Sequence, residues 1–418
     1  MTDLAGGDGG VMGGPGVPHR DWIALPMVGL FSIVLIASST EWIARRSFSE
    51  SKTNLANCMV LNDSSTGPRG IPNCICDEKE PETGWVEYRL NQSGYRAGAD
   101  YTEKKPGVYR IVMTGSSLAM GERVQQGESV AALLPLQLAS AIGHPVELYN
   151  QAMGWGFSHN TALRFGDVLA AKPDLILWEL SPMDVQRASF LLPSSYYPGS
   201  PRPDLPVNPS RSRLGKLVAF LKAPLSAKED KVTSLLGATS TALLLRHLLY
   251  QSQSIYVKVH LTGGNDGSAY MGGEDGTGFL RIEPSAQWKN HLNEFDRDAA
   301  EIEQRAGEAH IPIAVVLVPD RIQATMISMG NWPTGYDPYK LIEEVRSIVT
   351  SHGGIFLDVS RGFRTLPNAE QYYLPVDGHL NASGNALLSK LLAKQLMSGA
   401  IPELEARAQP RLTSGHGE

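Results

Sequence analysis

The sequence predicts a three-layer α/β/α domain with a five-stranded parallel sheet, preceded by an N-terminal transmembrane helix. After residue 85, five apolar runs rich in β-branched residues alternate with stretches in which apolar residues recur at helical spacing. Near-continuous hydrophobic strands between amphipathic helices are typical of a parallel sheet covered on both faces. The expected strands are VYRIVMTG, PVELYN, DLILWEL, IPIAVVLVP and GIFLDVS.

The N-terminal region predicts a tail followed by a membrane anchor. Residues 1–21 are Gly-rich and nearly devoid of large apolar side chains, so we expect them to be disordered. Residues 22–44 are the expected anchor, because an uncharged run begins at Trp22 and has about the 20 residues that cross a bilayer. Trp42 follows the run, where aromatic side chains favour the interface. A cleaved signal peptide is the competing interpretation, but the segment after the run is a poor cleavage site.

The segment 45–84 is predicted to be a linker that contains all three cysteines. Cys74 and Cys76 are too close in sequence to bridge comfortably, so Cys58 pairs with one of them and one thiol remains. Without a second cysteine pair or nearby histidines, this spacing does not indicate a zinc site. A disulfide favours an oxidising compartment.

The charges around the anchor favour a cytoplasmic location of the domain, whereas the disulfide favours a location outside the cytoplasm. Arg45 and Arg46 follow the run, and the positive-inside rule would keep that side in the cytoplasm. Long domains translocate regardless of such small differences. Together with the disulfide, this leads us to expect a single-pass protein of the cell inner membrane, with its domain on the periplasmic or extracellular side.

The globular domain is expected at 85–398, with an insertion at 192–284 and a flexible tail at 399–418. The insertion starts Pro/Ser-rich, ends Gly-rich and contains the apolar segment TALLLRHLLY. It is either a helical hairpin that shields the sheet or a lid over a site at the strand ends. The net charge of −6 gives no reason to expect a nucleic-acid partner.

Polar residues and glycines follow the predicted strands, where ligands bind in open parallel sheets. Ser116 and Ser117 follow the first strand, and Asp377 and His379 follow the last one through a loop. A serine, a histidine and a carboxylate are the parts required for acyl transfer by a serine nucleophile. The second and third strands lead to further residues of this kind: Asn150, Gly154, Gly156, Ser181 and Asp184. Backbone N–H groups at such turns can stabilise an oxyanion.

These segments resemble the blocks of the SGNH/GDSL hydrolase superfamily. The segment GSSLAMG is similar to the first block, which implies that Ser117 is the nucleophile and that its N–H is an oxyanion donor. YNQAMGWGFS resembles the second block, implying a further donor at Gly156 or, alternatively, at Gly154. DGHLNASG is similar to the last block, implying His379 as base and Asp377 as its partner. The resemblance spans about residues 88–396 and implies a flavodoxin-like fold with no metal or organic cofactor.

The sequence departs from the family pattern in the third block. Met183 stands where the family has an asparagine that supplies an oxyanion donor, so that donor is missing unless Ser181 provides it. Asp377 lies two residues before His379, a spacing that resembles membrane-associated exopolysaccharide O-acetyltransferases. We therefore expect a serine esterase or O-acyl (acetyl) transferase acting on small or polysaccharide esters. The alternatives are an inactive binding or assembly protein for envelope polysaccharide, with envelope-assembly partners, and a lipid esterase.

Overall fold

The computed structural model describes residues 21–63, 65–188, 239–262 and 276–408. The predicted five-stranded sheet is confirmed, and every neighbouring pair of its strands is parallel. The strand order is β6-β5-β7-β8-β9. The strands are β5 (Tyr109–Gly115), β6 (Val146–Asn150), β7 (Leu175–Leu180), β8 (Ile313–Leu317) and β9 (Ile355–Phe356). This is the order of flavodoxin-like sheets.

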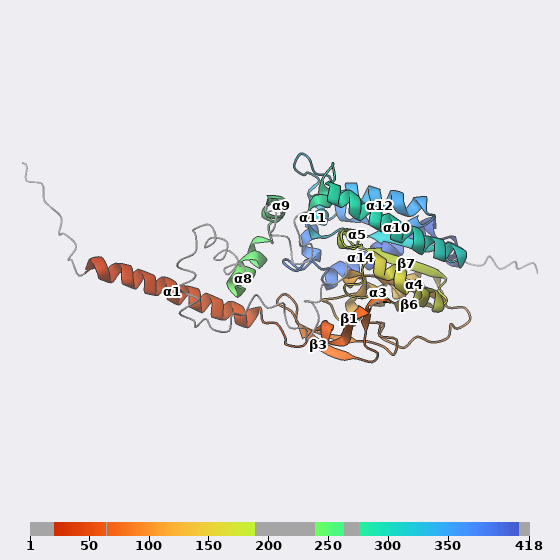
Figure 1. The fold of residues 1–418 in the computed structure, drawn as a ribbon, viewed down its shortest axis with the longest axis horizontal. Coiled ribbons are helices and arrows are strands. Elements are labelled where there is room, and N and C mark those ends of the chain that lie inside the picture. The colour runs from red at the N-terminus through yellow and green to blue at the C-terminus, as the bar shows by residue number, and fades with distance from the viewer. Residues whose placement is uncertain (1–20, 64, 189–238, 263–275, 409–418) are drawn as a thin grey trace, which may run out of the picture.

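Helices cover both faces of the sheet, as predicted (Figure 1). On one face α3 (Val130–Ile142) packs against α14 (Ala382–Gln395). On the other, α10 (Ala286–Glu308) packs against both α4 (Ser158–Ala170) and α12 (Lys340–Ser351). The residues of β5, β7 and β8 are buried throughout, as expected for the middle strands of a three-layer domain.

The winding of the sheet reverses between β5 and β7. The chain passes from β5 to β6 on one side and then crosses back to β7 on the other side. In open α/β sheets a crevice forms at the carboxyl ends of two such strands. The short helices α2 (Ser117–Met120) and α5 (Pro182–Gln186) begin directly after β5 and β7. Residues at their first turns therefore lie at the point where ligands usually bind.

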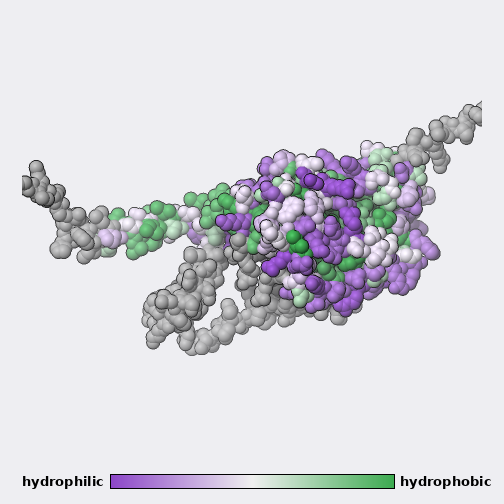
Figure 2. Space-filling model, turned by 90° about the horizontal axis from the view of Figure 1, so that it is seen from above, coloured by the Kyte–Doolittle hydropathy of each residue, from purple (hydrophilic) through white to green (hydrophobic). Residues whose placement is uncertain are grey.

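The N-terminal helix α1 (Asp21–Ser47) extends away from the domain (Figure 1). Its segment Pro26–Ser47 is long and apolar enough to cross a membrane by length and composition. Apolar side chains such as Leu30 and Phe31 are about two-thirds exposed, and Figure 2 shows this segment as a partly green rod outside the globular body. The predicted helix is thus present, while the expected tail at residues 1–20 lies outside the described residues.

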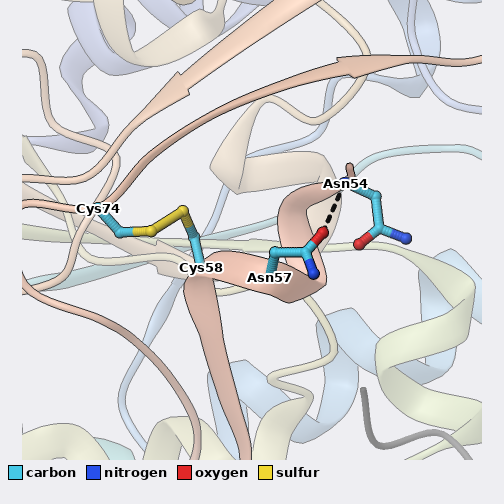
Figure 3. Close-up of a disulfide and its surroundings, with 4 residues drawn as sticks. All are labelled: Asn54, Asn57, Cys58 and Cys74. Carbon is cyan, nitrogen blue, oxygen red and sulfur yellow. Dashed lines mark hydrogen bonds between the residues drawn. A yellow bond between two sulfur atoms is a disulfide. The ribbon is translucent and has the colours of Figure 1, made fainter. Parts of the chain in front are cut away.

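The segment 45–84 is folded rather than a plain linker. It contains η1 (Leu55–Cys58) and three strands, and the third of them pairs with β4 across the expected domain boundary. The strands are β1 (Met59–Asp63), β2 (Gly67–Gly70), β3 (Ile75–Lys79) and β4 (Trp85–Arg89). Cys58 and Cys74 form a disulfide beside η1 (Figure 3) and Cys76 is free, which matches one of the two predicted pairings. Leu55 and Met59 are buried in the domain core, which explains why this segment docks on the domain.

The expected insertion at 192–284 is described only in part. Its described elements are α8 (Ser240–Leu249), α9 (Gln253–Thr262) and η4 (Gly278–Leu280), and the remainder lies outside the described residues. The expected C-terminal tail is folded as far as residue 408. It contains η6 (Leu396–Ala400) and α15 (Pro402–Ala408). Ile401, between these two helices, and Leu404, in α15, are buried.

Short elements complete the domain between the main strands and helices. They are η2 (Gln126–Glu128), α11 (Arg321–Met329), α13 (Ser360–Arg364) and η5 (Ala369–Tyr372). The helix α11, which the sequence analysis did not anticipate, begins with Asp320 as its side-chain cap and ends at Gly330 in the left-handed conformation. Both are ordinary helix-boundary signals.

Candidate active site

Ser117 occupies the first position of α2, and only Ser116 separates it from the buried strand β5. Gly115, the last residue of β5, has a φ of 147°, and a Cβ there would lie 2.2 Å from the carbonyl oxygen of Glu179. Only glycine therefore allows β5 to turn this close to β7. The turn leaves Ser117 half-buried, while Ser116 is buried and donates its hydroxyl to Asp184 at 3.0 Å. The two serines thus have different roles, and Ser117 is the accessible one.

The side chains of Ser117, His379 and Asp377 form a continuous chain of hydrogen bonds. His379 Nδ1 lies 2.6 Å from Asp377 Oδ1, and His379 Nε2 lies 2.9 Å from Ser117 Oγ. An ionised carboxylate only accepts hydrogen bonds, so the ring proton is on Nδ1 and the lone pair of Nε2 faces the serine hydroxyl. A histidine in this tautomer can remove the serine proton, which is the first requirement of a serine nucleophile.

The loop before α14 gives Asp377 and His379 their mutual geometry. The backbone N–H of Leu374 donates to the carbonyl of His379 at 2.8 Å, and that of Gly378 donates to the carbonyl of Leu374 at 3.1 Å. Gly378 adopts a φ of 90°, a left-handed conformation that favours glycine. The N–H of His379 donates to Asp377 Oδ1 at 3.0 Å, so one carboxylate oxygen holds both the ring and the backbone of the histidine.

The charge of Asp377 is stabilised from both sides. Burial alone would raise the pKa of this carboxyl, but the charge and hydrogen bond of His379 and the charge of Arg123 hold its pKa well below the usual range. Arg123 Nε donates to Asp377 Oδ2 at 3.2 Å. Asp377 therefore stays ionised at any pH at which a neutral histidine acts as a base.

Arg123 also contacts carboxylates of the β3–β4 hairpin. Its Nη1 lies 2.8 Å from Glu80 and 3.4 Å from Glu78. Burial raises the pKa of Glu80 to about 7, and burial likewise raises the pKa of the neighbouring Glu122. Protonation of Glu80 near neutral pH reduces the negative charge that competes with Asp377 for Arg123.

The backbone donors expected for an oxyanion differ in their availability. The N–H of Ser117 is at the first position of α2, where no carbonyl within the helix can accept it. The N–H of Gly156 instead donates to the carbonyl of Met153 at 2.9 Å, so our first choice of second donor is engaged in this conformation. The N–H of Gly154 contacts the sulfur of Met120 at 3.2 Å, which is a weak acceptor, so this N–H is less firmly engaged than that of Gly156.

Ser181, the residue expected to replace the donor absent at Met183, is engaged in this conformation. Its hydroxyl donates to Asp184 Oδ2 at 2.6 Å and its N–H donates to the same atom at 2.8 Å, which forms the capping box of α5. Because Ser116 donates to this oxygen too, Asp184 ties the turn after β5 to the turn after β7. Met183 itself is buried, with 8% of its surface exposed.

No cluster of three or more His, Cys, Asp or Glu side chains that could hold a metal ion occurs among the described residues.

The structure brings together Ser117, Asp377 and His379, the three residues predicted from the sequence. Two further residues at this site, Arg123 and Glu82, were not predicted. Arg123 has a φ of 72°, uncommon for a residue other than glycine, and its side chain donates to Asp377. Glu82 accepts two backbone N–H groups of the loop that carries Asp377. Neither residue belongs to a motif, and their proximity depends on how the β3–β4 hairpin docks, so the sequence held no signal for them.

Comparisons with known proteins give only distant similarities. Neither a scan against protein-family models nor a search of curated proteins yields a match. Solved structures similar to this fold include TesA, the acetyl xylan esterase AlAXEase and a lipase/acylhydrolase from Enterococcus faecalis. Their identities are 10%, 12% and 12%, and their TM-scores are 0.34, 0.36 and 0.35. The alignments cover 69%, 68% and 69% of this chain and 98%, 98% and 95% of those chains. Likeness at this level establishes neither an activity nor a substrate.

Proposed function

We propose that this protein is a membrane-anchored serine esterase or O-acyl transferase of the SGNH/GDSL type, acting on carbohydrate esters. The observation that carries the proposal is the hydrogen-bonded chain Asp377–His379–Ser117 at the switch point of the parallel sheet. Carbohydrate as the substrate class rests on the sequence resemblance, in particular on the two-residue spacing of Asp377 and His379.

The reaction follows from the roles of these side chains. Ser117 Oγ attacks the ester carbonyl while His379 Nε2 takes its proton, and Asp377 holds the imidazole in the tautomer that can do so. The N–H groups of Ser117 and Gly154 stabilise the oxyanion. His379 then gives the proton to the leaving alkoxide, and an acyl-enzyme forms on Ser117. Attack on this ester by water gives hydrolysis, and attack by a sugar hydroxyl gives acyl transfer.

The anchor and the disulfide support a location at the inner membrane with the domain outside the cytoplasm. Disulfides persist in oxidising compartments, and the Cys58–Cys74 bridge lies in the folded segment that follows the anchor in sequence. In this location the substrate is an envelope polysaccharide or a small ester, and envelope-assembly proteins are the expected partners.

Turnover of acetylated sugars by the purified full-length protein in detergent tests the proposal. Ser117→Ala and His379→Ala should each abolish turnover, and the double variant should lose little more, because residues that act as a unit are strongly non-additive. Ser116→Ala is the matched control: it removes one hydrogen bond to Asp184 and should cost less than about tenfold. Equal activity of Ser117→Ala and wild type would refute the assignment.

A lipid esterase is the second candidate, favoured by the exposure of α8. Leu245 and Leu248 of this helix are 55% and 61% exposed, and α8 packs against α1, the expected membrane anchor. Acyl chains in the bilayer could reach these side chains. A comparison of acetyl with long-chain acyl esters distinguishes the two: a preference for long chains supports the lipid esterase, and a preference for acetylated sugars supports the first proposal. Lack of turnover on every ester, with Ser117 unreactive, would instead indicate a binding protein.

A further inference from the structure

The carboxylate of Glu82 binds the backbone of residues 374–380, the loop that contains Asp377 and His379. Its oxygens accept the N–H of Val376 at 2.9 and 3.0 Å and the N–H of Asp377 at 2.6 Å. Glu82 lies in the turn between β3 and β4, 294 residues before Val376, and its side chain is only 3% exposed. The enclosed carboxylate therefore faces the tip of the loop.

The tip of this loop depends on an acceptor outside the loop. Backbone hydrogen bonds join Leu374 to His379 and to Gly378 within the loop. The N–H groups of Val376 and Asp377 instead point out of the loop, toward Glu82. Two consecutive N–H groups turned away from water require a partner, and a carboxylate is the strongest one available. One of these N–H groups belongs to Asp377 and the other to the residue before it. The carboxylate that accepts them therefore fixes the position of the Asp377 backbone, from which its side chain extends.

Glu82 is in turn held by the membrane-proximal helix α8. Nδ1 of His247 lies 2.9 Å from Glu82 Oε1, and the His247 ring packs edge-on against Phe48 at 5.5 Å. The first turn of α8 binds α1, because the N–H and hydroxyl of Thr241 donate to Glu41 at 2.9 and 2.8 Å. Figure 1 shows α8 beside the C-terminal half of α1.

A second contact joins the α8–α9 turn to the same loop. The buried guanidinium of Arg321 donates both to the carbonyl of Tyr250, at the end of α8, and to the carbonyl of Pro375 in the loop. Gln253 of α9 donates to Glu370 just before the loop at 2.6 Å. The described part of the insertion thus lies against the loop instead of standing open above the strand ends.

We infer that Glu82 is a positioning residue for the Asp377–His379 pair and that His247 of α8 keeps Glu82 in place. The loop of the active site is then connected to α1, the expected membrane anchor, through Glu82 and α8. This inference rests on the proposed function, because the pair is positioned for the same reaction. A misplacement of about 1 Å in a catalytic group can cost about 100-fold in rate.

The isosteric variant Glu82→Gln tests the inference in the full-length protein. It places an amide NH2 group against N–H donors, so we expect kcat to fall about 10- to 100-fold with KM within about twofold. Glu87→Gln is the matched control on the same hairpin, because the Glu87 side chain is 47% exposed and pairs with Arg89; its kcat should be unchanged. Wild-type kcat in Glu82→Gln would overturn the inference.

Substitutions of His247 provide a second test on a less buried side chain, which is 31% exposed. His247→Ala should lower kcat several-fold, and His247→Asn should restore most of it, because the Asn amide N–H can replace Nδ1–H toward Glu82. Equal activity of both variants and wild type would contradict the role of α8.

Hydrogen exchange separates this inference from the proposed function. Peptides covering 374–380 should exchange faster in Glu82→Gln than in wild type, and should not change in Glu87→Gln. This measurement needs no turnover. If the wild type is inactive and Ser117 is unreactive, the proposed function fails, while faster exchange still supports Glu82 as the support of the loop. Unchanged exchange overturns it.

Discussion

Replacing Asp377 with Asn should lower kcat by about 10⁴-fold, or about 5.5 kcal/mol of transition-state stabilisation. Oδ2 of Asp377 accepts Arg123 Nε, and Oδ1 accepts His379 Nδ1. An asparagine that keeps its oxygen toward Arg123 turns its NH2 group toward the histidine. Nδ1 must then become the acceptor, and the ring proton moves to Nε2. A protonated Nε2 cannot take the proton of Ser117, so the base is lost while the fold remains.

The reverse amide orientation has its own cost. With the oxygen toward His379, the NH2 group would meet the Nε–H of Arg123, two donors in contact. Because the pKa of Asp377 is lowered in the folded state, its charge contributes stability above its ordinary pKa, and this stability is lost as the pH falls below that value. Asp377→Asn should therefore be less stable than wild type near neutral pH, with the difference shrinking in acid.

Steady-state kinetics on a small acetyl ester, with thermal unfolding recorded in parallel, test this prediction. Asp358→Asn is the control, because Asp358 also has a lowered pKa and accepts hydrogen bonds from Arg346 and Ser360, but lies away from Ser117 in the loop after β9. It should lose stability yet keep kcat within about threefold of wild type. A loss below tenfold in Asp377→Asn would refute the tautomer argument.

Further predictions concern residues around the site. Burial raises the pKa of Glu179 to about 8, so between pH 5 and 8 the folded state keeps a proton that the unfolded state loses. This one group should thus cost up to about 1.4 kcal/mol of the free energy of unfolding per pH unit over this range, and Glu179→Gln should reduce the pH dependence measured by urea unfolding by that share. Met183→Asn should raise turnover by restoring an oxyanion donor, with Met183→Leu as the control; unchanged kcat in Met183→Asn would reject the missing-donor account. Cys58→Ser should cost about 3 kcal/mol, because the bridge to Cys74 closes a loop of 16 residues. Thiol labelling of the unreduced protein should find one free thiol, at Cys76, and three would exclude the bridge.

The sheet and its covering helices could be predicted because each is encoded locally. Continuous apolar runs mark buried strands, and β9 shows where this signal is weakest. The segment GIFLDVS predicts a full strand, yet only Ile355 and Phe356 pair with β8, at the half-exposed edge of the sheet. The fold of residues 45–84 was missed for a related reason: two short hairpins held by a disulfide and by docking on the domain have little periodicity to detect.

The serine, histidine and aspartate were predictable because the turn after β5 and the loop before α14 carry recognisable local patterns. Whether the N–H of an expected oxyanion donor is available was not predictable, because the direction of a backbone N–H depends on the turn that contains it; Gly156 directs its N–H to the carbonyl of Met153. The roles of Arg123 and Glu82 were the hardest to predict from the sequence. Their contacts with the Asp377 loop join residues separated by 254 and 295 positions.

Reaction of the full-length protein with a fluorophosphonate, mapped by peptide mass spectrometry, tests the central claim most directly. A serine activated by the Asp377–His379 pair should form one stoichiometric adduct, on Ser117, and His379→Ala should abolish it although the serine is still present. Ser116 is the preceding residue, but its hydroxyl donates a hydrogen bond to Asp184, so it should remain unmodified. An adduct absent from wild type, located on another serine, or formed equally fast in His379→Ala would contradict the account.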